Sequence, residues 1–202
     1  MHKPGSGKSI FKDNNDLYET IESHVSDLFK QAGKEAVLVH SRQTVFWLLK
    51  LKPDADEGLK IAALAHDIER TSPPPPLEQI IAGSSKGWMD PVFLRRHSET
   101  GAHIIAEVMH HLGAAPKLIE RVKFLVAGHE FSGTNDQNLI KDADSVSFFE
   151  NNVEEFLHLK VKKFGKEKVR AKFEWMFERI SSSHARQIAE PMYKRAIAGL
   201  SD

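Results

Sequence analysis

Histidine and aspartate residues on the apolar sides of predicted helices are the residues of this chain that could do chemistry. The adjacent pair His66 and Asp67 follows an apolar, alanine-rich run, IAALA, which is typical of a buried helix. Three further predicted helices carry His40, His97 and His129, respectively. Each histidine lies at helical spacing from the apolar residues of its helix, so it also points inward. Burying a carboxylate without a partner costs several kcal/mol, so Asp67 needs a cation, a set of hydrogen-bond donors or a metal ion.

Another predicted helix carries Asp142 and Asp144, which face different ways because they stand two residues apart. Only one of them can therefore join the inward histidines. Imidazole and carboxylate groups from separate helices can hold a divalent ion and leave positions for water and substrate. A set rich in nitrogen and free of thiolates favours Mn, Fe, Co, Ni or Zn over Ca or Mg. The simpler alternative stays open: each histidine could be a hydrogen-bonded core residue, and Asp144 could pair with a Lys or Arg.

Helices must position these groups, because apolar residues recur at helical spacing along most of the chain and no stretch alternates as a strand would. We therefore expect an all-α fold. Residues 1–15 are expected to form a flexible terminus, since their GSGKS segment lacks the spacing of a phosphate-binding loop. We expect a metal-binding domain over 16–150 and further helices over 151–202 packed on the same domain. The predicted helices cover 16–33, 34–51, 54–70, 91–113, 116–130 and 138–152, then 153–202 throughout.

Composition excludes several classes of protein. The chain of 202 residues has 28 Lys and Arg residues and 28 Asp and Glu residues, so its net charge is balanced. Such a balance gives no reason to expect a nucleic acid as partner. Cysteine is absent, which removes disulfides and thiolate ligands. No apolar run approaches the roughly 20 residues that span a bilayer, so we expect a soluble, cytoplasmic protein without a membrane partner.

The order of the inward residues resembles the HD superfamily of metal-dependent phosphohydrolases, over residues 17–150. The segments that carry the resemblance are LVHSRQTV, AALAHDIER, RRHSETGAHII, VAGHE and KDADSVSFF. The resemblance implies an HD-type helical bundle that holds one or two divalent ions. It implies that the metal ligands are His40, His66, Asp67 and Asp144, joined by His97 and His129 where a second ion binds.

The resemblance also implies hydrolysis of a nucleotide or another small phosphorylated molecule by a metal-activated water. Asp67 and Glu69 are the expected catalytic residues, with Glu69 standing where the family often has glycine. Arg70, Lys86 and Arg96 are the expected substrate-binding residues, although a solvated helix end or surface explains these charges as well. Residues 71–89 hold a run of prolines and form either a binding loop or an inert excursion.

Two alternatives remain at this point. Some proteins of the HD fold hold two irons with the same ligand pattern and act as oxygenases, and others have lost catalysis and serve as regulatory or binding modules. The residues after 150 show no motif, and packing or homodimer formation would account for them.

Overall fold

Every regular element in the described part of the chain is a helix, which confirms the all-α prediction. The structure is a computed structural model that describes residues 14–72, 83–84, 86–131 and 133–201. The elements in chain order are α1 Asn14–Gln31, α2 Glu35–Leu51, α3 Glu57–Ala65, η1 Ile68–Thr71, η2 Gly87–Met89, α5 Pro91–His111, α6 Pro116–Gly128, α7 Asn135–Asn151, α8 Val153–Glu155, η3 Phe156–Lys160, α9 Val161–Phe164, α10 Lys166–Glu178 and α11 Ser183–Ala198.

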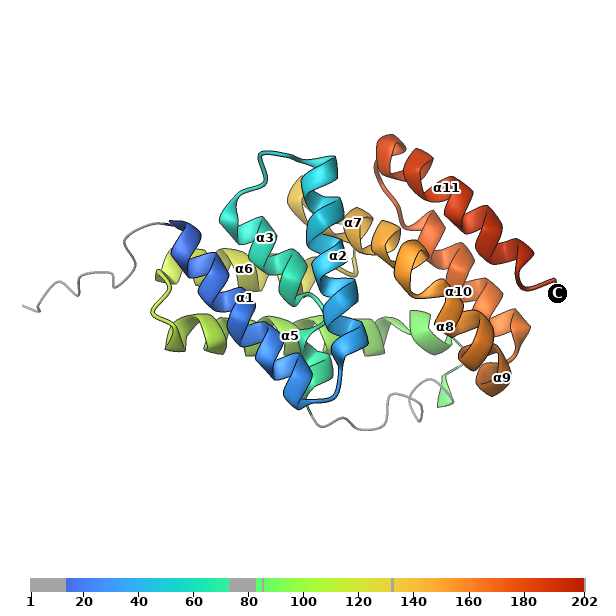
Figure 1. Cartoon of the computed structure of the whole chain (residues 1–202), viewed down its shortest axis with the longest axis horizontal. Helices are drawn as coiled ribbons and strands as arrows, with labels where there is room; N and C mark the ends of the chain where they lie inside the picture. The colour runs from blue at the N-terminus through green and yellow to red at the C-terminus, as the bar shows by residue number, and fades with distance from the viewer. Residues whose placement is uncertain (1–13, 73–82, 85, 132, 202) are drawn as a thin grey trace, which may run out of the picture.

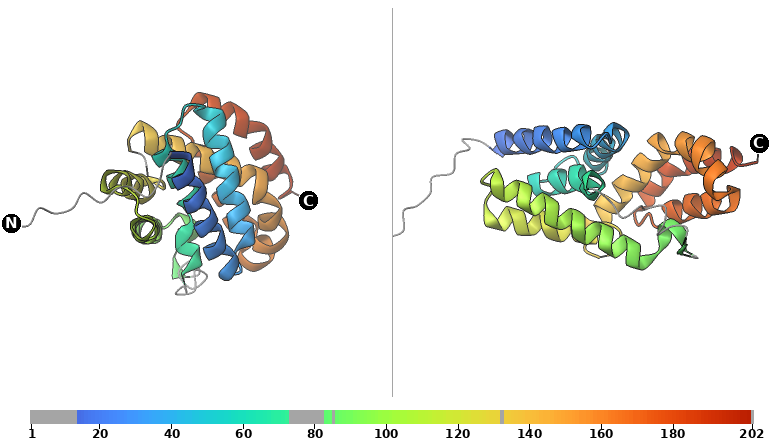
Figure 2. Two further views of the ribbon diagram at one scale, coloured as in Figure 1. Left: turned by 60° about the vertical axis from the view of Figure 1, so that its left-hand side comes forward. Right: turned by 90° about the horizontal axis from the view of Figure 1, so that it is seen from below.

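The helices form two groups that share α7 (Figure 1). In the first group α5 lies along α6, while α3 packs on α1, α2 and α6. The second group, α8 to α11, occupies the other end of the molecule, as the view from below shows (Figure 2). Helix α7 contacts α2, α3 and α6 on one side and α10 and α11 on the other. The C-terminal helices are therefore packed on the same helix that carries Asp144.

The apolar core follows the same division. One cluster surrounds α3, whose residues Ile61 to Ala65 are fully buried. A second, aromatic cluster lies among the C-terminal helices and includes Phe148, Phe156 and Phe173. Helix α7 contributes Ile140 and Ala143 to the first cluster and Val146, Phe148 and Phe149 to the second. The apolar residues of this single helix therefore link the two cores.

The predicted helix over 54–70 is shorter than expected. It begins after Asp56, whose side chain accepts a hydrogen bond from the Leu59 amide and caps the helix. It ends at Ala65, and the chain continues through His66 and Asp67 into the 3₁₀-helix η1. The pair thus occupies a turn, where backbone groups are freer to aim side chains than inside a regular helix.

The C-terminal stretch is also less continuous than the expected helix over 153–202. Gly165 interrupts it with a φ of 89°, a left-handed conformation that favours glycine. A second break separates α10 from α11, where Asp142 accepts hydrogen bonds from the amides of Ser181 (2.7 Å) and Ser182 (2.8 Å). Helix η3 is a π-helix, a wide turn that often occurs at functional sites.

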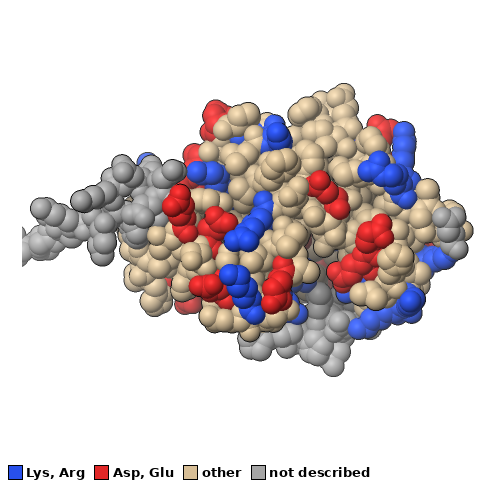
Figure 3. All heavy atoms as spheres, in the orientation of Figure 1, with Lys and Arg blue, Asp and Glu red and all other residues tan. Residues whose placement is uncertain are grey.

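The molecular surface carries charges of both signs. On the face of Figure 3, Lys and Arg side chains alternate with Asp and Glu, so no single-sign field covers it. Within the described residues, no helix has the length and apolar character needed to cross a membrane. Most of the expected flexible segment 1–15, and residues 73–82 of the expected loop over 71–89, lie outside the described residues.

Candidate metal centre

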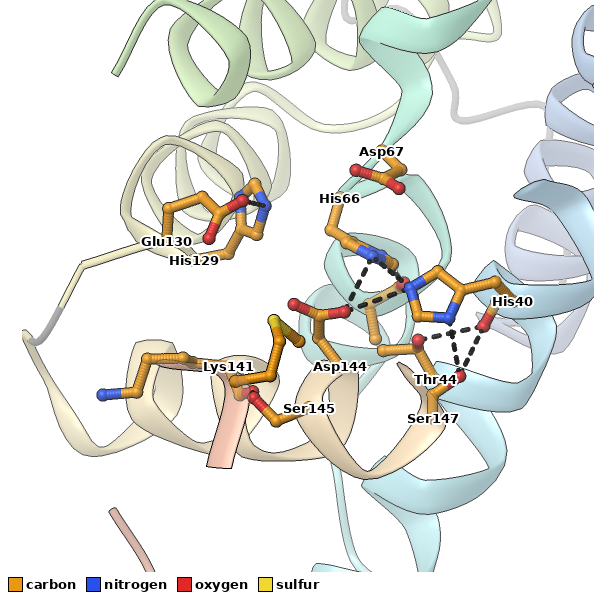
Figure 4. Close-up of polar contacts among 12 residues, drawn as sticks. His40, Thr44, His66, Asp67, His129, Glu130, Lys141, Asp144, Ser145 and Ser147 are labelled. Carbon is orange, nitrogen blue, oxygen red and sulfur yellow. Dashed lines mark hydrogen bonds and ion pairs between the residues drawn. The ribbon is translucent and has the colours of Figure 1, made fainter. Parts of the chain in front are cut away.

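Five elements bring the predicted ligands to one place inside the bundle. His40 comes from α2, His97 from α5 and Asp144 from α7, while the His66–Asp67 turn follows α3 and His129 ends α6. Figure 4 shows His40, His66 and Asp144 pointing toward one another, with Asp67 and His129 facing the same space. We call these groups the metal centre, and its residues are His40, His66, Asp67, His97, His129 and Asp144.

The first half of the centre joins His40, His66 and Asp144. The Nε2 atom of His40 lies 3.0 Å from Asp144 Oδ1, and that of His66 lies 3.6 Å from the same oxygen. The two Nε2 atoms are 3.3 Å apart. Asp67 offers a carboxylate oxygen to this half, within 4.8 Å of the ring nitrogens of both histidines.

The second half of the centre joins Asp67 to His97 and His129, whose ligand atoms also lie within 4.8 Å of one another. The Nε2 atom of His97 is 3.0 Å from Asp67 Oδ1. Asp67 takes part in both groups, so its carboxylate would be shared if each group held an ion.

Every histidine of the centre has its Nδ1 atom engaged, which leaves Nε2 directed inward. The Nδ1–H groups of His66 and His129 donate to the carbonyls of Ala63 (2.8 Å) and Val126 (2.7 Å). The Nδ1 atom of His40 lies 2.9 Å from Ser147 Oγ, and that of His97 lies 3.2 Å from Glu69 Oε2. Such contacts fix the tautomer and the ring orientation of metal-binding histidines.

While the rings are neutral with Nδ1 protonated, these contacts crowd hydrogen-bond acceptors together. The Nε2 atoms of His40 and His66 then face each other and Asp144 as lone pairs, unless a ring takes up a second proton. The Nε2 atoms of His97 and His129 are buried and make no hydrogen bond among the described residues. Buried polar atoms almost always have partners, and either a divalent cation among these atoms or further protons on the rings would supply them. The donor set of four imidazoles and two carboxylates fits a divalent transition metal.

The pKa values of these groups agree with a site that attracts positive charge. Burial opposes the charged form of His66, but the charge of Asp67 and contacts with Asp144 raise its pKa to about 9. Burial likewise opposes ionisation of Asp67, yet Arg70 and His66 hold its pKa well below the ordinary range. Burial lowers the pKa of His129 to about 4, so this ring is neutral at pH 7. A metal ion that bound His66 at neutral pH would therefore displace a proton from it.

Two side chains that the sequence reasoning missed support the centre. Arg179 of α10 lies with its Nη1 atom 2.8 Å from Glu130 Oε2 and its Nη2 atom 3.4 Å from Asp144 Oδ2. It also donates to the His129 carbonyl at 3.1 Å. Arg179 is 50 residues from His129 and belongs to no local motif, so no spacing signal reveals it. Glu130 could have been found, because it adjoins His129 near the end of a predicted apolar stripe.

A pocket of about 630 Å³ opens onto the metal centre. Of the predicted substrate-binding residues, Arg70 and Arg96 line this pocket, whereas Lys86 is exposed and does not line it. The Nε atom of Arg70 also lies 3.6 Å from Asp67 Oδ1. Glu69 lines the pocket and accepts the hydrogen bond from His97, so its observed contact is with a predicted ligand.

Asp142 and Asp144 divide as their spacing predicts. Asp144 enters the metal centre, and Asp142 holds the start of α11 instead. The other histidines of α5, His103, His110 and His111, are exposed. On this helix only His97, which shares the apolar stripe, reaches the centre.

The fold and the site define an all-helical protein with a candidate centre for divalent metal ions. The chain matches the family model described as a domain of unknown function, DUF4202, over residues 19–198. It therefore belongs to this family, and the match includes every residue of the metal centre as well as Arg179. Comparison with curated proteins and with solved structures gives no match.

Proposed function

We propose that this protein is a metal-dependent phosphohydrolase of the HD type, acting on a nucleotide or another small phosphorylated molecule. The observation that carries the proposal is the set of four inward Nε2 atoms around Asp67 and Asp144, each ring held by its Nδ1 contact. The pocket beside this set is large enough for a small molecule and is lined by arginine and lysine side chains.

The residues divide into two ligand sets that share Asp67. His40, His66, Asp67 and Asp144 would hold the principal ion, and His97 and His129 would join Asp67 around a second one. A bound divalent ion would supply Lewis acidity, making water a better nucleophile and neutralising charge on a phosphoryl group. The set favours Mn, Fe, Co, Ni or Zn over Mg.

The surrounding side chains have positioning and binding roles. Glu69 orients His97 through its Nδ1–H group, and Arg179 holds the outer oxygen of Asp144. Arg70 and Arg96 give the pocket positive charge that attracts a phosphate. Asp67 has its carboxylate in both ligand sets, so we assign it, with Glu69, to the catalytic residues.

Metal content and phosphate release test the proposal together. The protein is purified without chelators and its metals are measured by mass spectrometry, and phosphate release is then followed with small phosphate esters and Mn, Co, Ni, Fe or Mg. We expect one or two metal ions per chain and phosphate release that a chelator abolishes. His66→Ala should lose both the metal and the activity, whereas His103→Ala, an exposed histidine of α5, should keep both.

Two results would contradict the proposal. One is a reconstituted protein that holds no divalent metal, which would favour a regulatory or binding role. The other is two bound irons with oxygen consumption and no phosphate release, which would identify an oxygenase.

A further inference from the structure

The pocket has six cationic side chains on its walls, and they differ in whether they have a partner. Three of them make ion pairs: Arg70 with Asp67, Lys160 with Glu155, and Arg179 with Glu130. Lys34, Arg96 and Lys172 line the same pocket without an ion pair to a described residue. Lys34 and Arg96 are exposed, where water satisfies them, but Lys172 is partly buried.

The amine of Lys172 is under two opposing influences, because aromatic ring faces favour its charge and burial disfavours it. Its amine lies 4.4 Å from the centre of the Trp175 ring and 5.6 Å from that of Phe148. Burial lowers the pKa of Lys172 to about 8; the charge of Glu130 opposes this shift and that of Arg179 adds to it. An amine in such a place is stabilised by any anion that enters the pocket beside it.

The wall around Lys172 is aromatic. Phe148 and Phe156 line the pocket with their ring centres 5.2 Å apart, and Trp88 lies 5.4 Å from Phe156. The π-turn of η3 belongs to this wall, since Phe156 and Lys160 are its first and last residues. A ligand that reaches Lys172 therefore contacts apolar and aromatic surface as well as the amine.

We propose that Lys172 binds a second anionic group of the substrate, apart from the phosphate that reacts at the metal centre. The inference rests on the proposed function and narrows it. The substrate class is a phosphate ester whose apolar or aromatic body carries a further negative charge, a carboxylate or a second phosphate. Lys172 is then a specificity-determining residue, contributed by a helix for which the sequence alone gave no role.

Binding of inorganic phosphate to the metal-free protein tests this assignment without relying on catalysis. With the metals removed by a chelator, no bound ion can hold the phosphate, so binding reports the side chains of the pocket, and the variant shows the share that belongs to Lys172. Calorimetry should show phosphate binding to the wild type that is weakened tenfold or more in Lys172→Met. Lys168→Met is the matched control, because Lys168 is an exposed lysine of the same helix, and it should bind phosphate as the wild type does. Lys172→Met keeps the length of the side chain and removes a disfavoured charge, so it should fold; circular dichroism and thermal melting check this.

A comparison of substrates gives a second, separate result. With the metal-loaded protein, Lys172→Met should raise the KM for 4-carboxyphenyl phosphate about tenfold with kcat little changed, and should alter phenyl phosphate hydrolysis less than threefold.

Phosphate affinity equal in wild type and Lys172→Met, or no phosphate binding by the wild type, would overturn the inference. If phosphate binding depends on Lys172 but no ester is hydrolysed, the proposed function fails and the anion site stands. If both esters are hydrolysed and respond equally to Lys172→Met, the hydrolase stands and the second anion site does not.

Discussion

A single guanidinium connects parts of the metal centre that are far apart in sequence. Arg179 contacts Glu130, Asp144 and the carbonyl of His129, and its side chain is only 6% exposed. Because the carboxylates it neutralises are equally shielded from water, removing Arg179 would leave negative charge uncompensated in the protein interior. The residue therefore secures the C-terminal helices to the site through charge as well as packing.

Replacement of Arg179 by methionine should lower the free energy of unfolding by about 3–5 kcal/mol, the usual effect of removing one partner of a buried ion pair. Urea unfolding of the chelator-treated protein, followed by circular dichroism, measures this. The double variant Arg179→Met with Glu130→Gln should lose less than the sum of the two single variants, because each alone leaves the other charge unpaired. Arg195→Met, an exposed arginine of α11, should change stability by less than about 0.5 kcal/mol. An effect of Arg179→Met as small as that of the control would show that the ion pairs contribute nothing.

Lys172 should make stability depend on pH in the alkaline range. Its pKa is about 8 in the folded protein and 10.5 when unperturbed, so the folded state binds fewer protons between these values. Stability then rises with pH from about 8 to 10.5, and below pH 8 the full penalty of up to about 3 kcal/mol applies. Lys172→Met should remove this rise and increase the free energy of unfolding at pH 7. Urea titrations at pH 7, 8, 9 and 10 compare the two proteins; parallel pH profiles would contradict the prediction.

At this scale the sequence revealed the buried histidines better than the side chains that surround them. His40, His97 and His129 could be found because a polar residue on an apolar stripe is conspicuous at helical spacing. Arg179 and Lys172 could not, because arginine and lysine are ordinary on a helix and their burial depends on how α10 packs against α7. Long-range pairing of this kind leaves no periodic trace in the sequence.

At the scale of elements, the close approach of α5 to the His66–Asp67 turn shapes the centre. A Cβ atom built on Gly101 would lie 3.5 Å from the His66 carbonyl oxygen and 3.6 Å from a methyl group of Val126. These are ordinary contact distances, so Gly101 provides space for one methyl group and no more. The small residue at this position thus permits the close contact between α5 and the turn, and the space beside it is filled by protein.

Gly101→Ala should therefore be tolerated, with stability unchanged or raised by up to about 1 kcal/mol because alanine is the better helix former. Gly101→Leu should lower stability by about 1–3 kcal/mol through overpacking, and should move His97 away from Asp67. Melting curves measure the first effect, and metal content after reconstitution measures the second, with a loss of the ion bound by His97. Strong destabilisation by Gly101→Ala would contradict the prediction, because it would mean that α5 and the His66–Asp67 turn are too close for an added methyl group.

Element ends were harder to predict than element types. The apolar stripes gave α1, α2, α5, α6 and α7 with bounds within about three residues of those observed, since amphipathic spacing is a local property. The end of α3 at Ala65 and the π-turn of η3 depend on tertiary contacts, including the His66 ring bonded to the Ala63 carbonyl. The sequence therefore located the His66–Asp67 pair but placed it on a helix and not in a turn.

At the scale of the whole molecule, the pocket is lined from both groups of helices. Its walls include His40 and His97 of the first group and Phe156, Lys172 and Arg179 of the second. Because α7 supplies apolar residues to both cores, neither group buries its apolar surface without it. The division into a metal-binding domain and C-terminal helices thus describes the order of segments in the sequence. The pocket itself is built from both groups of helices.

The shared helix predicts that the molecule unfolds in one cooperative step. Far-ultraviolet circular dichroism reports all the helices, whereas tryptophan fluorescence reports mainly the second core, where Trp88, Trp175 and part of Trp47 are packed. Urea transitions followed by the two probes should coincide for the metal-free protein. Manganese at a hundred times its dissociation constant should stabilise the protein by about 2.7 kcal/mol, since only the folded state binds it. That shift should appear equally in both probes, because Arg179 and Asp144 couple the metal centre to the second core; a fluorescence midpoint that separates from the circular dichroism midpoint would instead show two independently folding units.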